Sequence, residues 1–116
     1  MLRLVDATAD TAPDLRRIGL YGFERELERY VVGTLRAHWP RSAIMRATDA
    51  GQLERVRQQL WLCAQAPPGT TLAPVLWLDG IGTDAAPVRL GRGVWRLAAP
   101  VTAERLVRGI ERVLRG

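Results

Sequence analysis

The sequence predicts a single α/β domain built on a three-layer, mostly parallel sheet with helices on both faces. Three observations support this fold class. The chain has 116 residues, which suffices for one hydrophobic core and is too short for two. Short apolar runs, typical of strands, alternate along the chain with longer amphipathic segments, typical of helices. The hydrophobic content of 47% and the charged content of 25% are ordinary for a globular domain.

Each element follows from the local spacing of apolar residues and from the residues that stop it. Continuous apolar runs predict strands, and apolar residues three and four apart predict helices. Pro40 stops the first helix, and Pro67, Pro68 and Gly69 stop the second. The predicted strands are residues 2–5, 18–23, 43–45, 75–78, 88–90 and 94–97, and the predicted helices are residues 24–38, 51–66 and 103–114. Residues 88–97 fit either a tight hairpin or two separate strands.

The inner faces of the helices follow from the same spacing. Asp49 and Thr102 stand where a helix cap is expected. The positions expected to face the core are Leu27, Tyr30, Val31, Thr34, Leu35 and His38 in the first helix, Leu53, Val56, Leu60 and Cys63 or Ala64 in the second, and Leu106, Val107, Ile110, Val113 and Leu114 in the third. Residues 1–16 form an N-terminal arm, and residues 17–116 form the domain.

The composition excludes several classes of protein. The single cysteine, Cys63, cannot form an internal disulfide. With one histidine and one cysteine a structural zinc site has too few soft ligands, so we expect neither metal nor cofactor. No apolar run is long enough to span a bilayer, and residues 1–6 do not resemble a secretion signal. These observations predict a cytoplasmic protein that does not bind a membrane.

The basic residues favour an anionic partner. All 17 are arginines, the formal net charge is +5, and the pI is about 10.9. Such a charge favours nucleic acid, an anionic lipid or an acidic protein. The densest cation–aromatic cluster, Arg89, Arg92, Trp95 and Arg96, is joined by an arginine stripe on the last helix. The predicted interaction surface consists of Arg89, Arg92, Trp95, Arg96, Arg105, Arg108 and Arg112.

Two segments within residues 17–116 resemble the receiver domain of response regulators. Residues 73–79, Ala-Pro-Val-Leu-Trp-Leu-Asp, are similar to the third receiver strand, which places Asp79 where receivers carry the phospho-accepting aspartate. Residues 99–106 are similar to the entry into the last receiver helix. The resemblance implies a signalling domain whose last strand and last helix, here about residues 94–114, form the partner or dimer face.

The same comparison implies that the phosphorylation chemistry is lost. Receivers place acidic residues directly after the first strand to hold Mg²⁺, whereas here the first acid is Glu24. The lysine of the family is replaced by Ala99. The stretch between Asp79 and Pro100 is also too short for a complete strand–helix unit. Asp79 is therefore predicted to be an inactive phosphoacceptor-like position, because the transferred charge needs both a metal and a cation.

The sequence favours a non-catalytic regulatory adaptor that acts by protein–protein contact or as a homodimer. Two alternatives stay open. One is a nucleic-acid-associated domain that uses the Arg/Trp surface. The other is a cyclic-dinucleotide sensor, since residues 46–49 fit the pattern Arg-x-x-Asp. The glycines of residues 80–84 are a poor phosphate loop, because Asp84 repels phosphate. His38 and Cys63 are expected to be structural, at a helix end and in the core.

Overall fold

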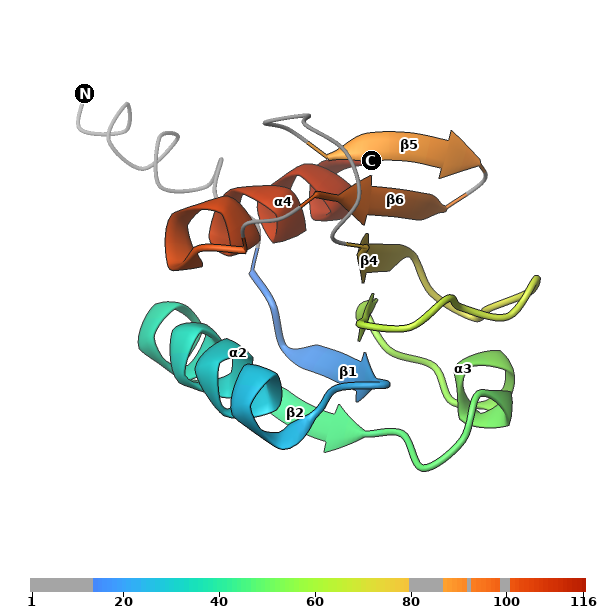
Figure 1. Cartoon of the computed structure of the whole chain (residues 1–116), viewed down its shortest axis with the longest axis horizontal. Coiled ribbons are helices and arrows are strands. Elements are labelled where there is room, and N and C mark those ends of the chain that lie inside the picture. The colour runs from blue at the N-terminus through green and yellow to red at the C-terminus, as the bar shows by residue number, and fades with distance from the viewer. Residues whose placement is uncertain (1–13, 80–86, 92, 99–100) are drawn as a thin grey trace, which may run out of the picture.

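The computed structural model describes residues 14–79, 87–91, 93–98 and 101–116 (Figure 1). One six-stranded sheet runs in the order β2-β1-β3-β4-β6-β5. The strands are β1 (Arg17–Tyr21), β2 (Ala43–Arg46), β3 (Leu60–Cys63), β4 (Val75–Leu78), β5 (Val88–Gly91) and β6 (Val94–Leu97), and the helices are α2 (Arg25–His38), α3 (Gly51–Arg55) and α4 (Ala103–Arg115). The α/β fold class with a mostly parallel sheet is confirmed.

Five strands of the sheet are parallel and one is antiparallel. β1 pairs with β2 and β3, β3 pairs with β4, and β4 pairs with β6, all in parallel. β5 pairs with β6 in antiparallel fashion at the sheet edge. Of the two predicted arrangements, the antiparallel pairing of β5 with β6 fits the hairpin and not two parallel strands. Counted over the parallel strands alone, the order is 2-1-3-4-5, which is one of the two common orders of doubly wound α/β folds.

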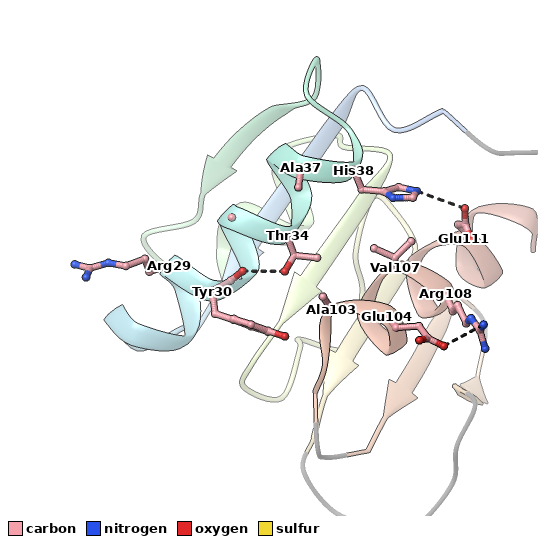
Figure 2. A pocket seen from close by; sticks show the side chains of 11 residues that line it. Arg29, Tyr30, Thr34, Ala37, His38, Ala103, Glu104, Val107, Arg108 and Glu111 are labelled. Carbon is pink, nitrogen blue, oxygen red and sulfur yellow. Dashed lines mark hydrogen bonds and ion pairs between the residues drawn. The ribbon is translucent and has the colours of Figure 1, made fainter.

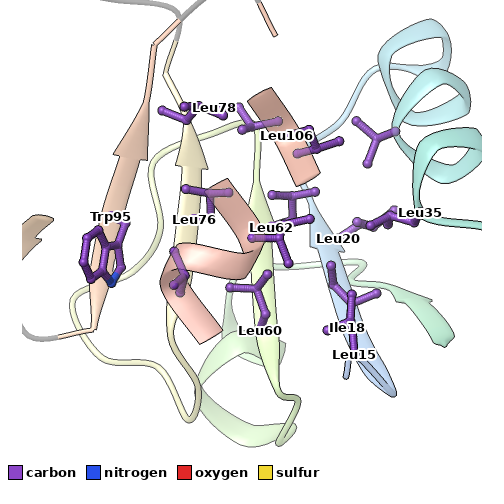
Figure 3. Close-up of a cluster of buried hydrophobic side chains, with 14 of the residues drawn as sticks. Leu15, Ile18, Leu20, Leu35, Leu60, Leu62, Leu76, Leu78, Trp95 and Leu106 are labelled. Carbon is purple, nitrogen blue, oxygen red and sulfur yellow. The ribbon is translucent and has the colours of Figure 1, made fainter. Parts of the chain in front are cut away.

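The main hydrophobic core lies between the sheet and the pair α2 and α4 (Figure 3). Alternate strand residues point to this face, as the two-residue period of a strand requires. The strand side chains are Ile18, Leu20, Leu60, Leu62, Leu76, Leu78, Trp95 and Leu97, and the helices add Val31, Leu35, Leu106, Ile110 and Val113. Of the core positions predicted for α2, two are wrong: Tyr30 is 45% exposed, and His38 is exposed as well.

The opposite face of the sheet is covered differently. Its cluster contains Trp61, Cys63 and Val75 from the strands and Leu53 from α3. α3 has only five residues, and the connection from β3 to β4 contains no helix. The indole of Trp61 lies directly over Gly19 of the neighbouring strand. A bulky aromatic ring thus fills space on a face where the chain supplies little helix.

The predicted helix 51–66 is wrong after residue 55. The spacing of Leu53, Val56, Leu60 and Cys63 fits a helix, but residues 60–63 are four apolar residues in succession and form the third parallel strand. All four are fully buried, as expected for a strand in the middle of a parallel sheet. A helix would turn some of these side chains toward solvent, whereas a central strand buries both of its faces.

A glutamine side chain fixes the start of β1 against β3. The Gln59 side-chain oxygen accepts hydrogen bonds from the backbone N–H groups of Arg16 and Arg17, and its amide nitrogen donates to the Asp14 carbonyl at 2.9 Å. Leu15, between these contacts, is 1% exposed and belongs to the main core. The predicted strand at residues 2–5 lies outside the described residues.

Candidate functional site

The carboxyl ends of the parallel strands meet at a pocket of about 590 Å³. In open α/β sheets, ligands usually bind at this edge. Here the walls come from the segments that leave the first three parallel strands. The lining residues are Leu20, Tyr21, Gly22, Phe23, Glu24, Glu28, Arg46, Ala47, Thr48, Asp49, Ala50 and Gln65. The chain leaves β1 through Gly22, whose φ of +80° disfavours other residues.

Two charged groups of this edge pocket, Glu28 and Arg46, are paired with each other. Arg46 Nε donates to Glu28 Oε1 at 2.7 Å, and a second contact joins the same two groups. The Glu28 carboxylate raises the pKa of the Arg46 guanidinium, mainly through this hydrogen bond. Asp49 Oδ1 accepts the Gln52 backbone N–H at 3.1 Å, so it bonds the first turn of α3 although the N-cap is the next residue, Ala50. Arg46 and Asp49, the predicted cyclic-dinucleotide pair, thus serve other partners in this structure.

Asp79 does not occupy the place predicted from the receiver resemblance. It follows β4, which is the fourth parallel strand, because residues 60–63 supply the third. The position directly after the third strand is Ala64. Among the residues that the structure describes, β5 is the one element that lies between β4 and β6 in the chain. Ala99 and Pro100 lie outside the described residues.

The predicted arginine–tryptophan surface is divided between the two faces of the sheet. Arg96 lies on the α3 face, paired in register with Trp77, and its Nη1 is 3.9 Å from Asp79 Oδ2. Trp95 points to the α4 face, where it joins the main core. Arg92 lies outside the described residues. The sheet therefore separates Arg96 from the rest of the predicted cluster.

Trp95 is a buried side chain and not an exposed stacking platform. It is 5% exposed and lies between two guanidinium groups. The Arg112 carbon Cζ is 4.9 Å from the ring centroid, and that of Arg89 is 5.6 Å away. These distances are typical of cation–π contacts. The arrangement fixes the β5–β6 hairpin to α4, and it leaves little of the indole for contact with a base.

A second pocket, the α2–α4 groove, runs between these two helices on the outer side of the molecule (Figure 2). Its volume is about 750 Å³. Small and apolar side chains form much of its surface, and charged groups stand along it. The lining residues are Arg29, Tyr30, Gly33, Thr34, Ala37, His38, Ala103, Glu104, Val107, Arg108 and Glu111. The half-exposed Tyr30 extends toward Ala103 at the beginning of α4 (Figure 2).

The α2–α4 groove is bounded at its other end by a contact between the two helices. His38 Nε2 at the end of α2 lies 3.8 Å from Glu111 Oε2 of α4. Glu104 and Arg108, one turn apart, form an ion pair at 3.0 Å. α2 and α4 run in the same direction, since both follow parallel strands. His38, expected to act within its own helix, instead connects the two helices.

The arginine stripe predicted on α4 lines another pocket beside the same helix. A pocket of about 670 Å³ is lined by Arg105, Arg108, Arg112 and Arg115, together with Pro87, Glu104 and Glu111. Glu104, Arg108 and Glu111 line both this pocket and the α2–α4 groove. These three residues thus stand on the crest of α4, with a groove on either side.

Cys63 is a buried thiol, as expected for a core residue. Its side chain has no exposed surface, and burial raises its pKa to about 12. The thiolate is the reactive form of cysteine. Because the raised pKa keeps this group protonated at neutral pH, Cys63 is poorly suited to nucleophilic chemistry.

Neither a family model, nor a curated protein, nor a solved structure matches the chain. Among the described residues, no three His, Cys, Asp or Glu side chains gather closely enough to hold a metal ion. Within the same residues, no helix is both long and apolar enough to cross a membrane.

The α2–α4 groove was not among the sequence-based candidates. Its small residues are Gly33 and Ala37 on α2 and Ala103 on α4. In the sequence, Gly33 and Ala37 are four residues apart, which places them on the same side of α2. This pair predicts a face without large side chains. It does not indicate that a second helix borders it, because this depends on how the crossovers pack.

Proposed function

We propose that this chain is a non-catalytic regulatory domain that acts by protein–protein contact through the α2–α4 groove. The observation that carries the proposal is the groove itself, with the half-exposed Tyr30 beside small residues and charged groups along it. Recognition surfaces commonly combine an exposed aromatic anchor, an apolar centre and a polar rim. A cytoplasmic signalling role, as the receiver resemblance implies, is part of this proposal.

Two features support a receiver-like scaffold without receiver chemistry. The order 2-1-3-4-5 of the parallel strands is that of flavodoxin-like folds, to which receivers belong. The position after the third parallel strand is Ala64, which has no group that could accept a phosphoryl group. Asp79 lies one strand further along the sheet and faces Arg96. In this proposal the scaffold presents a surface and transfers no phosphate.

We expect that acetyl phosphate and Mg²⁺ do not phosphorylate the chain. Intact-mass measurement after incubation checks this, with Asp79→Asn as the matched variant. Both proteins are expected to keep their unmodified mass, because the phosphoryl oxygens would lack the compensating cations that the reaction needs. A phosphorylated wild type together with an unmodified variant would restore Asp79 as a phosphoacceptor.

The groove itself can be tested with a photo-activated cross-linking residue placed at Ala37 in the native cells. Ala37 is exposed and lines the groove. The control carries the same residue at Arg57, which is exposed in the turn before β3. We expect a covalent protein adduct from position 37 and none from position 57. If position 37 gives no protein adduct, the proposed function is wrong.

Nucleic-acid binding is the alternative that the arginines of α4 favour, since four of them line one pocket. Because Trp95 is buried, such binding would depend on phosphate contacts and not on stacking of bases. Contacts of this kind weaken steeply as salt rises, because counterions are released on binding. If the chain shifts nucleic acid in a gel in a salt-sensitive way and gives no protein adduct from position 37, nucleic-acid binding is the function and protein recognition is not.

A further inference from the structure

The charged residues on the crest of α4 form a pattern that is complementary to itself. Arg115, which lines the pocket of the arginine stripe and not the α2–α4 groove, continues the line of the three crest residues Glu104, Arg108 and Glu111, and is counted with the crest from here on. At about 100° per residue, these four positions fall within an arc of about 60°. Leu106, Ile110 and Val113 of the same helix are buried on the other side. Acidic and basic groups therefore alternate along one outward-facing line.

This alternation is placed symmetrically along the helix. Glu104 and Arg115 are equally far from the midpoint between Gly109 and Ile110, and so are Arg108 and Glu111. If two copies of α4 lie antiparallel about that midpoint, Glu104 meets Arg115 of the second copy. Arg108 then meets Glu111 of the second copy. Every crest charge faces an opposite charge, and the two-fold axis generates each pair twice.

Other arrangements of two α4 helices bring like charges together. About a two-fold axis parallel to the helices, Glu104 would face Glu104 and Arg108 would face Arg108. Like charges set directly opposite each other disfavour such a complex, which is how charged patterns give specificity. The pattern thus selects one orientation of a second copy.

We propose that the partner at the α2–α4 face is a second copy of this chain, with the two α4 helices antiparallel. This inference rests on the proposed function and names its partner. Exposed ion pairs contribute little affinity by themselves. The affinity comes from covering the apolar surface of Tyr30 and Val107, two partly exposed residues that line the α2–α4 groove. The crest charges set the register of the two helices.

Charge reversal tests the orientation. Arg108→Glu places two carboxylates opposite each other, and Glu111→Arg places two guanidinium groups opposite each other. Each variant alone is expected to dimerise about tenfold more weakly than the wild type in low salt. An equimolar mixture of the two variants is expected to recover association, because each chain then presents the charge that the other lacks. Sedimentation equilibrium measures all three samples.

The matched control is Arg57→Glu, the same charge reversal outside the groove, which is expected to dimerise like the wild type. Circular dichroism establishes that every variant is folded. A dimeric wild type with two weakened variants and a recovered mixture supports the proposal. A dimer that neither reversal weakens, or a mixture that stays dissociated, overturns the antiparallel pairing.

The cross-linking experiment separates this inference from the proposed function. An adduct of two copies of this 12.9 kDa chain through Ala37 supports self-association. An adduct with a different protein, together with a monomeric wild type in sedimentation, overturns the second copy as partner and leaves protein recognition at the groove in place. Absence of any protein adduct overturns both.

Discussion

Gly19→Ala is expected to destabilise the fold by about 3 kcal/mol or more. A Cβ atom at Gly19 would lie 2.2 Å, 2.3 Å and 2.7 Å from three ring atoms of Trp61. The ring cannot easily withdraw. It is fully buried among Leu53, Cys63 and Val75, and its Nε1 donates to the Val56 carbonyl at 3.3 Å. A loss of this size is a large part of the stability of a small domain.

Urea denaturation followed by circular dichroism measures this effect. The control is Gly33→Ala, because a Cβ at this position of α2 would meet nothing within 4 Å. Removing a glycine from a helix interior is expected to stabilise the protein by about 0.5–1 kcal/mol. Combining Gly19→Ala with Trp61→Leu removes the clash and is expected to restore folding in part. A Gly19→Ala protein as stable as the wild type would show that the indole does not lie over Gly19.

The second large effect is a loss of stability at alkaline pH caused by Cys63. Burial raises the pKa of this thiol from 9.0 to about 12. Below pH 9 the thiol is protonated in both the folded and the unfolded chain, so its contribution does not change. Between pH 9 and about 12 the unfolded chain releases the proton and the folded chain retains it. Rising pH therefore favours unfolding, by about 1.4 kcal/mol per unit and about 4 kcal/mol over the whole interval.

Cys63→Ala isolates this contribution. The variant loses the sulfur and a small amount of packing, so it is expected to be somewhat less stable at pH 7. It retains every other titrating group, including Tyr21 and Tyr30. The difference in unfolding free energy between wild type and variant should therefore shrink, and then change sign, as the pH rises above 9. A difference that stays constant from pH 8 to pH 11 would contradict the raised pKa.

Much of the fold could be predicted because several segments fit either a strand or a helix in length and apolar spacing, but not both. Val75–Leu78 is too short for a helix and continuously apolar. Residues 103–114 place Leu106, Ile110 and Val113 on one side, and all three are buried. The helix predicted at residues 24–38 is also found, with its beginning moved by one residue.

The failure at Leu60–Cys63 has a physical cause. Leu53, Val56, Leu60 and Cys63 satisfy the helical spacing, so a helix through all of them buries one continuous side. What distinguishes the strand is that Trp61 and Leu62 are apolar as well, and only a central strand buries four such residues in succession. Because the helical spacing hides this strand, the sequence places Val75–Leu78 third, whereas it is the fourth parallel strand, and Asp79 follows that fourth strand.

The candidate site was harder to predict than the fold. Tyr30 is adjacent to Val31 in the chain, and helical spacing alone assigns both to the inner face. The buried side of α2 is narrower and centres on Val31 and Leu35, which leaves Tyr30 at the groove. Such a groove exists only because α4, more than sixty positions later in the chain, lies beside α2. A pairing of this kind is a property of the crossovers and is not encoded in any one segment.

The Gln59 contacts have a consequence for the newborn chain. β1 is the first described strand in the sequence, yet one of its two neighbours ends at Cys63 and its backbone start is bonded to Gln59. While the ribosome is still synthesising β2, the edge of β1 that pairs with β3 in the folded protein has no partner. The pairing of β1 with β3 can thus form only after the chain has emerged from the exit tunnel as far as Cys63.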